Sequence, residues 1–347
     1  MKIGLIFAGQ GAQYSGMGKS LYESSVSANK IFNLSGEEIK SWCFEGTKEI
    51  LRQTNITQPC IYAVTMAAYG AFLEEISKLD EKSLNTIEMQ GMAGFSLGEY
   101  AALTASGSIK DFETGLNIVK QRGEWMNDAG KDEFGESQGG MIAAFGERQD
   151  ILNCVELSRE DGILEGVNFN SPIQTVVAGN KEALVRFKVK SKELGHIKAV
   201  PLSVSTAFHS PMMEPTVEKL YHLLLESKLV KPTTKIYSNV TGKNIMEGSA
   251  GEEGKWLADV MAKQVKSPVY WQEIIENLQA DGVNILIEIG PGNTLSGLAK
   301  KINPELITMN IEDHKSLMET MEMLKSLLSK ELGLVDTVIL EEGEKPC

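Results

Sequence analysis

Cysteine and histidine are both scarce in this chain of 347 residues, which has four of each. The cysteines lie far apart, with no C-x-x-C pair and no histidine at metal-ligand spacing; they are Cys43, Cys60, Cys154 and Cys347. A disulfide scaffold is usually dense in cysteine, and a structural zinc site needs ligands at short, fixed spacings. The sequence therefore predicts reduced thiols in a cytoplasmic protein and no metal site.

Long apolar runs and excess positive charge are also missing. No stretch reaches the roughly 18 apolar residues of a membrane-spanning helix, and the apolar run at residues 3–8 is too short for the core of a signal peptide. The chain has 34 basic and 47 acidic residues and a net charge of −13. This charge disfavours nonspecific binding to nucleic acid or to an anionic membrane, so neither is expected as a partner.

The remaining composition, with 42% hydrophobic and 23% charged residues, is typical of a folded globular protein. In the first part of the chain, strand and helix patterns alternate, which predicts an α/β fold. The expected strands are residues 3–7 and 87–93, and the expected helices are residues 57–79, 99–105 and 112–126.

The middle of the chain has a different element order. Its predicted strands and helices follow one another as βαββαβ, the ferredoxin-like arrangement. They are residues 141–145, 148–158, 163–169, 175–179, 181–194 and 197–203. The first pattern then resumes with a strand at residues 284–289.

This order predicts a core of residues 1–136 and 205–311, interrupted by an inserted subdomain of residues 137–204. Residues 312–347 are expected to form a C-terminal helix, to about residue 332, and an acidic tail that ends in disorder.

Gly94-Phe95-Ser96-Leu97-Gly98 matches G-x-S-x-G between a predicted strand and a predicted helix. In this context a tight turn lifts the serine hydroxyl out of the sheet, so Ser96 is a candidate nucleophile. An ordinary serine in a glycine-rich turn gives the same short pattern, but the flanking strand and helix favour the nucleophile. The turn also aims the backbone N–H of Leu97 at a developing oxyanion.

A serine nucleophile needs a base, and the histidines are few. His222 and His314 lie in charged helical stretches, and His196 begins a predicted strand. His209 follows a strand in a loop where Pro211 sets a turn, and loops at strand ends commonly present catalytic groups. His209 is therefore the candidate base.

Gly9-Gln10-Gly11-Ala12-Gln13 directly follows the first strand. It matches neither a P-loop nor a complete dinucleotide fingerprint, so dinucleotide binding is not expected. A glutamine flanked by glycines, whose backbones can approach closely, is suited to donate hydrogen bonds to an oxyanion. Gln10 is thus a candidate oxyanion donor.

Taken in order, these and further segments resemble the malonyl-CoA:acyl carrier protein transacylases and the acyltransferase domains of polyketide synthases. The resemblance runs from about residue 3 to about residue 311. The segments that carry it are Gly9-Gln10-Gly11-Ala12-Gln13, Thr57-Gln58-Pro59, Gly94-Phe95-Ser96-Leu97-Gly98-Glu99-Tyr100, Gln121-Arg122-Gly123, Asn170-Ser171-Pro172, Ala207-Phe208-His209-Ser210, Ser238-Asn239-Val240-Thr241-Gly242, Ser267-Pro268-Val269 and Glu288-Ile289-Gly290-Pro291-Gly292. It implies an α/β-hydrolase-like core with a parallel sheet and an inserted ferredoxin-like subdomain.

The resemblance also implies acyl transfer in two steps. Ser96 attacks the thioester of malonyl-CoA with His209 as base, and the phosphopantetheine thiol of acyl carrier protein then cleaves the acyl-enzyme ester. In this family a main-chain carbonyl orients the histidine, and the matching position here is Gln264. Backbone N–H groups of Gln10 and Leu97 would hold the oxyanion, with no bound cofactor.

By the same resemblance, Arg122 selects the substrate. Malonyl ends in a carboxylate, which a guanidinium can hold through two parallel, charge-assisted hydrogen bonds. Asn170 matches a residue that supports the site, and Phe208 matches family members whose bulk disfavours an α-methyl group. The chain departs from the family at Phe95, where histidine is usual, and at Ala8, where proline is common. Phe95 puts the polarity of the acyl pocket in question.

Acyl carrier proteins are acidic, so a chain of net charge −13 needs a local positive patch to bind one. Basic residues of the predicted subdomain form a candidate docking surface: Arg186, Lys188, Lys190, Lys192 and Lys198. A solvated helix face explains the same cluster.

Two other functions stay open on sequence alone. The first is an acyl hydrolase that clears stalled acyl groups from acyl carrier protein; Arg122 argues against it, and Phe95 mildly favours it. The second is a noncatalytic carrier-binding module, which has no use for Ser96, His209 and Arg122 together. Fatty-acid and polyketide synthesis use the same transfer, so both pathways fit, and the family precedent favours a monomer.

Overall fold

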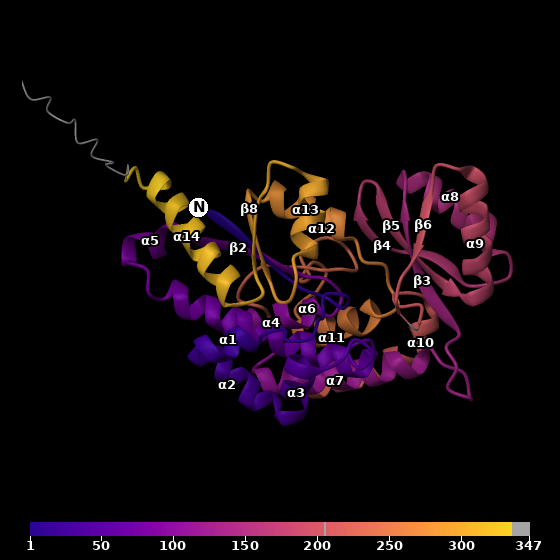
Figure 1. Cartoon of the computed structure of the whole chain (residues 1–347), viewed down its shortest axis with the longest axis horizontal. Helices are drawn as coiled ribbons and strands as arrows, with labels where there is room; N and C mark the ends of the chain where they lie inside the picture. The colour runs from indigo at the N-terminus through magenta and orange to yellow at the C-terminus, as the bar shows by residue number, and fades with distance from the viewer. Residues whose placement is uncertain (205, 335–347) are drawn as a thin grey trace, which may run out of the picture.

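The computed structural model describes residues 1–204 and 206–334, and these residues form two sheets (Figure 1). The larger sheet has the strand order β7-β2-β1-β8-β9, and each of its strand pairs is parallel. Its strands are β1 (Lys2–Phe7), β2 (Glu88–Gly94), β7 (Ile236–Tyr237), β8 (Ile285–Ile289) and β9 (Ile307–Ile311). The predicted α/β class with a parallel sheet is confirmed.

Helices cover both faces of this sheet because its central strand carries apolar side chains on both sides. Ile3, Leu5 and Phe7 point into the largest hydrophobic cluster, whereas Ile6 points into a second cluster on the opposite face. The second cluster is completed by α12 (Trp271–Ala280) and α13 (Thr294–Ile302).

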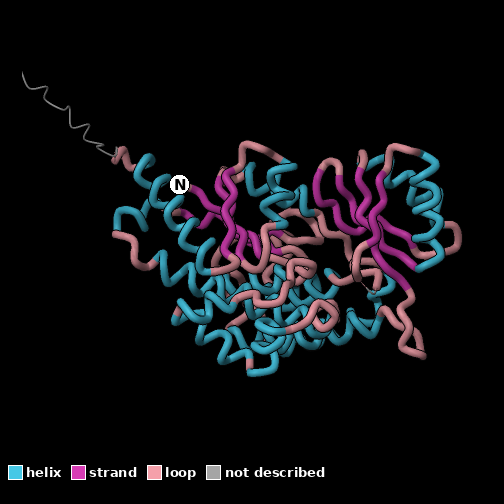
Figure 2. The backbone as a smooth tube through the Cα atoms, in the orientation of Figure 1, coloured by secondary structure: helices cyan, strands magenta, loops and turns pink. Residues whose placement is uncertain are grey.

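Helices of the largest cluster form a broad layer below the sheet in the view of Figure 2, except α14, which runs along one side of the sheet (Figure 1). They are α1 (Lys19–Ser24), α2 (Val26–Ser35), α3 (Glu37–Glu45), α4 (Thr54–Ile76), α6 (Gly98–Ala105), α7 (Phe112–Ala129), α10 (Glu214–Glu226), α11 (Glu253–Gln264) and α14 (His314–Glu331). The short α5 (Glu81–Thr86) leads into β2, and a turn of 3-10 helix, η1 (Pro211–Met213), precedes α10.

The smaller sheet is antiparallel, with the strand order β4-β5-β3-β6. Its elements are β3 (Gly139–Phe145), α8 (Arg148–Arg159), β4 (Leu164–Ser171), β5 (Gln174–Asn180), α9 (Lys181–Leu194) and β6 (Lys198–Pro201). This is the predicted βαββαβ order. Helices α8 and α9 cover the outer face, while Met141 and Val176 on the other face pack into the main core. The smaller sheet therefore turns one face toward the larger one.

Helix α4 is long and apolar enough to cross a membrane by length and composition alone. However, 78% of its most apolar window is buried inside the protein, as expected of the central helix of a globular core. Three cysteines, Cys43, Cys60 and Cys154, are buried and free, which agrees with the predicted thiols. Cys347 and the predicted acidic tail lie outside the described residues.

The sequence patterns located the strands well and the helices incompletely. The strands expected at residues 3–7, 87–93 and 284–289 correspond to β1, β2 and β8 within a residue or so at each end. The helix expected at residues 57–79 begins and ends three residues earlier, at Thr54 and Ile76. Helices α1–α3, α5 and α11–α13 and strands β7 and β9 were not predicted, and α10 was recognised only as the charged helical stretch around His222.

The close approach of α6 to the central strand requires glycine at position 98. A Cβ there would lie 2.1 Å from the carbonyl oxygen of Phe7 and 2.8 Å from that of Ala8. We expect Gly98→Ala to lower the free energy of unfolding by about 3 kcal/mol, because backbone cannot move aside as a flexible side chain does. Gly297→Ala is the matched control, since its Cβ would meet nothing within 4 Å and alanine favours the helix. Urea unfolding of both variants tests this, and equal stability would contradict the packing argument.

Candidate active site

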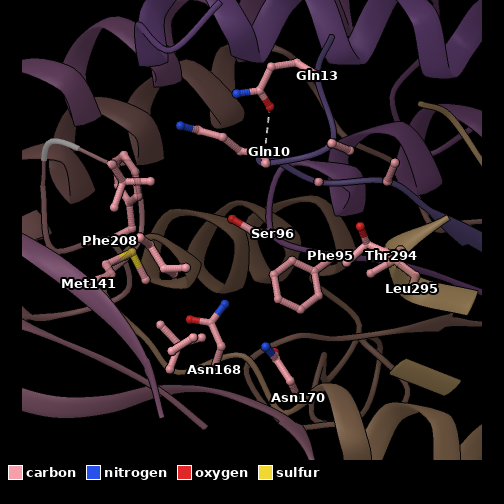
Figure 3. A pocket seen from close by; sticks show the side chains of 18 of the residues that line it. Gln10, Gln13, Phe95, Ser96, Met141, Asn168, Asn170, Phe208, Thr294 and Leu295 are labelled. Atoms are coloured by element: carbon pink, nitrogen blue, oxygen red, sulfur yellow. Dashed lines mark hydrogen bonds between the residues drawn. The ribbon is translucent and has the colours of Figure 1, made fainter. Parts of the chain in front are cut away.

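Ser96 lies in the turn between β2 and α6, at the carboxyl end of the parallel strands. Its backbone has a φ of 51°, in the left-handed region that costs an L-residue free energy. Gly94 permits the turn, because a Cβ on it would lie only 1.9 Å from the backbone carbon of Gly98. The turn directs the Ser96 side chain into a cleft (Figure 3).

Asn239, which follows β7, holds this turn from the side. Its Oδ1 accepts a hydrogen bond from the N–H of Ser96 at 2.7 Å, and its Nδ2 donates to the carbonyl of Gly94 at 2.6 Å. The N–H of Asn239 donates in turn to the carboxylate of Glu99 at 3.1 Å. The strained turn is thus fixed by a side chain that is 143 residues away in the sequence.

His209 is buried next to Ser96, as predicted. Its Nε2 lies 2.8 Å from the Ser96 Oγ, and its Nδ1 lies 3.0 Å from the carbonyl oxygen of Gln264 and 3.1 Å from that of Ser267. Because carbonyl oxygens only accept hydrogen bonds, Nδ1 carries the proton and Nε2 presents its lone pair to the serine hydroxyl. This is the geometry that a general base needs.

The pKa of His209 is lowered to about 4. Burial is the main cause, because removal from water penalises the imidazolium, and the positive charge of Arg122 adds to it. The two carbonyls act in the opposite direction but do not offset these effects. His209 is therefore neutral at physiological pH and ready to accept a proton.

Arg122, on α7, is 1% exposed and reaches the same place. Its Nη1 donates to Gln58 Oε1 at 2.8 Å, and its Nη2 donates to Ser96 Oγ at 3.1 Å and to Gln264 Oε1 at 3.0 Å. The guanidinium also lies over the ring of Tyr100, 5.2 Å from its centre. Burial lowers the pKa of Arg122, yet an arginine stays charged in proteins, so a full positive charge lies beside the serine hydroxyl.

Gln264 has two functions, of which the sequence indicated one. Its carbonyl contacts His209 as expected, but its side chain is also buried in the site. Its Nε2 donates to the carbonyl of Ser96 and to Glu99 Oε2, both at 2.8 Å. Roles for Gln58, Glu99 and Asn239 in the site were likewise not predicted.

Ser96 opens into a cleft of about 1010 Å³ between the two sheets. Phe208 and Met141 line one side, and Asn168 and Asn170 line the floor (Figure 3). Both asparagines are 5% exposed, and neither Oδ1 has a partner among the described residues. Phe95 also lines the cleft, and its ring packs edge-to-face on Trp271 with centroids 5.3 Å apart.

The two candidate oxyanion donors flank the Ser96 turn. Leu97 is the N-cap residue of α6, so its N–H precedes the helix and has no intrahelical partner. Gln10 lies in the loop after β1, next to Ser96 in Figure 3, and its side chain donates to Thr54 Oγ1 at 3.3 Å. Gln13 Oε1 accepts the N–H of Gly11 at 2.8 Å and so fixes this loop.

The basic cluster on α9 lies on the outer layer of the smaller sheet, and none of Arg186, Lys188, Lys190 and Lys192 lines the cleft. Arg186 donates to the carbonyls of Ser158 and Arg159 at the end of α8, and Lys190 pairs with Glu193. Lys188 and Lys192 are exposed. A docking role for this cluster stays a prediction.

Among the described residues, no group of three or more histidine, cysteine or acidic side chains is placed to hold a metal ion. Two fully buried carboxylates at the site have strongly raised pKa values: Glu99, beside Gln264, and Glu288, which lines the cleft at the start of α13 and whose pKa burial also raises to about 7. Glu99 is the one near Ser96 and Arg122. Burial raises its pKa to about 7, while hydrogen bonds from Gln264 and Asn239 and the charge of Arg122 act to lower it.

Comparison with known proteins gives concordant results. The model of a family described as acyl transferase domain matches residues 5–315. A malonyl CoA-acyl carrier protein transacylase from Bacillus subtilis (strain 168) is 34% identical over 330 residues, covering 93% of this chain and 98% of that protein. One from Escherichia coli (strain K12) is 32% identical over 323 residues, covering 92% of this chain and 98% of that protein.

Solved structures agree. A malonyl CoA-acyl carrier protein transacylase from Clostridium perfringens is 36% identical with a TM-score of 0.84, covering 96% of this chain and all of that one. A malonyl-transacylase in complex with a type II polyketide synthase acyl carrier protein is 30% identical with a TM-score of 0.83, covering 93% of this chain and 100% of that one.

The lowered pKa of His209 gives a testable pH dependence. Only neutral imidazole can accept the serine proton, so reaction of Ser96 with an uncharged fluorophosphonate is expected to keep its rate between pH 8 and pH 5. A histidine with an ordinary pKa near 6.5 would lose about 30-fold over that interval, since only about 3% of it is neutral at pH 5. Intact mass spectrometry of the adduct gives the rates. Glu99, with a pKa of about 7, also titrates in this interval. A loss of that size that persists in Glu99→Gln, which lacks this titration, would show that burial and Arg122 do not act as described.

Proposed function

This chain belongs to the acyl transferase domain family, and we propose that it transfers a malonyl group from malonyl-CoA to the phosphopantetheine thiol of acyl carrier protein. The observation that carries the proposal is the fully buried guanidinium of Arg122, 3.1 Å from the Oγ of Ser96. That oxygen is in turn 2.8 Å from Nε2 of His209. Nucleophile, base and a cation for a carboxylate therefore meet at one point.

In the first step, Ser96 Oγ attacks the thioester carbonyl while its proton passes to Nε2 of His209. The carbonyl oxygen becomes an oxyanion, which the N–H groups of Gln10 and Leu97 would stabilise. When the tetrahedral intermediate collapses, the carbon–sulfur bond breaks and the coenzyme A thiolate takes the proton from His209. A malonyl ester on Ser96 and free coenzyme A result.

The second step runs the same chemistry in reverse with a different thiol. His209 takes the proton of the phosphopantetheine thiol, the thiolate attacks the ester carbonyl, and the proton returns to Ser96 Oγ as its bond to carbon breaks. Because His209 is neutral at the start of each step, one base serves both. A thioester is consumed and a thioester is formed, so no cofactor is required.

The preference for malonyl follows from the surroundings of Arg122. Its acceptors are the amide oxygens of Gln58 and Gln264 and the hydroxyl of Ser96, which are uncharged. A buried cation with neutral partners gains much from a carboxylate ligand. Phe208 on the cleft wall would limit room for an α-methyl group. We therefore propose malonyl, rather than acetyl or methylmalonyl, as the acyl group.

The carrier partner is proposed on two grounds. The related malonyl-transacylase noted above was solved with an acyl carrier protein, and this chain is 96% covered by the Clostridium perfringens transacylase structure. The exposed Lys188 and Lys192 of α9 stay the proposed docking residues.

A paired assay separates transferase from hydrolase. Holo acyl carrier protein and malonyl-CoA are mixed with the enzyme, and malonyl-carrier and free malonate are measured in the same tube by mass spectrometry. We expect malonyl-carrier to dominate, with Ser96→Ala giving no acyl-enzyme. If free malonate dominates instead, the enzyme is an acyl hydrolase rather than a transferase. If the wild-type chain acquires no malonyl adduct, it is a noncatalytic carrier-binding module.

The carboxylate role of Arg122 predicts a selective loss. In Arg122→Ala, acylation of Ser96 by malonyl-CoA should fall about 100-fold, the equivalent of about 3 kcal/mol for a charge-assisted hydrogen-bonded pair. Acylation by acetyl-CoA, which has no carboxylate, should fall far less. Arg122→Lys keeps the positive charge but cannot form two parallel hydrogen bonds to one carboxylate, so its rate of malonyl acylation should lie between those of the wild type and Arg122→Ala. Equal losses for both acyl groups would assign Arg122 to the structure of the site rather than to its substrate.

A further inference from the structure

Glu99 is a buried acid that the proposed mechanism does not use. It is the second residue of α6, three positions after the nucleophile, and its side chain has no exposed surface. Its Oε2 accepts a hydrogen bond from Gln264 Nε2 at 2.8 Å, and its Oε1 accepts from the N–H of Asn239 at 3.1 Å. A carboxylate is costly to bury, so its presence beside the nucleophile calls for a physical reason.

The orientation of the Gln264 amide supplies that reason. On one side, its Nε2 faces Glu99, and on the other its Oε1 faces Arg122 Nη2 at 3.0 Å. Both oxygens of Glu99 accept N–H groups, which is the pattern of an ionised carboxylate, and with a pKa of about 7 this form predominates at pH 8. An ionised carboxylate can only accept hydrogen bonds, and a guanidinium can only donate them. One orientation of the amide therefore satisfies both neighbours, and the reversed orientation would set donor against donor at Arg122 and acceptor against acceptor at Glu99.

We propose that Glu99 is a positioning residue for the carboxylate clamp, by which we mean the guanidinium of Arg122 and the two glutamines, Gln58 and Gln264, that hold it. Glu99 fixes the Gln264 amide, whose oxygen then holds the Arg122 guanidinium beside Ser96. The inference rests on the proposed malonyl transfer and deepens it. Glu99 touches neither substrate nor the reacting atoms, and it acts through Gln264 on the residue that selects the acyl group.

The other oxygen of Glu99 ties the same residue to the nucleophile. It holds the N–H of Asn239, whose side chain holds both the N–H of Ser96 and the carbonyl of Gly94. One carboxylate thus connects the turn that carries Ser96 to the amide that places Arg122. Its negative charge also offsets part of the cost of burying Arg122, since each group favours the charged form of the other.

Glu99→Gln tests this role because it keeps the shape of the side chain and replaces one acceptor by a donor. The backbone N–H of Asn239 requires the oxygen of the new amide, so its NH2 group faces Gln264 Nε2, donor against donor. Gln264 then either turns, which also opposes its oxygen to the carbonyl of Ser96 and its NH2 group to Arg122, or shifts away; in both cases Arg122 loses its fixed acceptor. We expect the ratio of malonyl to acetyl acylation rates on Ser96 to fall about tenfold, measured by single-turnover intact mass spectrometry. Glu99→Asp keeps two acceptor oxygens on a shorter stem and should recover part of the ratio.

A double-mutant cycle with Arg122→Ala separates positioning from general damage. If Glu99 acts through the guanidinium, Glu99→Gln should change the ratio in the wild-type background and leave it unchanged when Arg122 is alanine. Glu288→Gln is the matched control. Glu288 is also a fully buried carboxylate, but it accepts the N–H groups of Leu295 and Ser296 at the start of α13. This control should lower the melting temperature without moving the ratio.

The outcomes are distinguishable. Equal losses for both acyl groups in Glu99→Gln, a raised malonyl preference, or the same shift in the Arg122→Ala background would each overturn the role of Glu99. In all three cases the proposed malonyl transfer would stand, provided that the wild-type chain forms a malonyl ester on Ser96. A wild-type chain that forms none overturns both proposals.

Discussion

The positive charge of Arg122, buried beside the Ser96 hydroxyl, constrains the orientation of the polar groups around it. The guanidinium of Arg122 has lost its water, and its hydrogen-bond acceptors are neutral oxygens of Gln58, Gln264 and Ser96. Such a charge is stable only where neighbouring dipoles are fixed toward it, which is why two glutamine side chains are buried here. Glu99 is close enough to offset part of the cost of burying this charge, but among the described residues no carboxylate accepts a hydrogen bond from the guanidinium, which therefore stays attractive to a carboxylate that enters from the cleft.

This constraint also accounts for the way in which His209 is oriented. In many hydrolases a carboxylate holds the histidine base, whereas here two main-chain carbonyls do so, from Gln264 and Ser267. An acid at that position would raise the pKa of the histidine and would compete with a carboxylate ligand for Arg122. Carbonyl groups fix the tautomer without adding charge, so the base stays neutral and the guanidinium stays available.

Three kinds of signal predicted parts of the site from sequence: a local motif for Ser96, the small number of histidines for His209, and the family resemblance for Arg122 and the Gln264 carbonyl. The Ser96 turn follows from two glycines between an apolar strand and a helix, and His209 follows from the scarcity of histidine. The roles of Gln58, Glu99 and Asn239 could not be predicted in this way, because their partners lie 64 to 165 residues away in the chain. Only the folded chain brings these polar groups together.

The fold shows the same division. Apolar runs next to glycines predicted β1, β2 and β8, and the βαββαβ order of predicted elements included all four strands of the smaller sheet. The two-residue strand β7 is too short to form a pattern, and the helices α1–α3 bury only one to three side chains each. Such short elements are stabilised by packing against the core rather than by the propensity of their own sequences.

Phe95 lines the cleft but takes no part in the hydrogen bonds that place Ser96, His209 and Arg122. Its ring packs on Trp271, toward the hydrophobic cluster of α12 and α13, on the opposite side of the sheet from the largest cluster. The hydrogen bonds that place Ser96, His209 and Arg122 come from glutamine, asparagine and main-chain groups, and a phenyl ring takes part in none of them. An apolar residue at this position changes the polarity of the cleft wall, but the buried charge of Arg122 is held by α7 and by the glutamines of α4 and α11. The position of the buried charge and the polarity of the wall are therefore separate properties of this cleft.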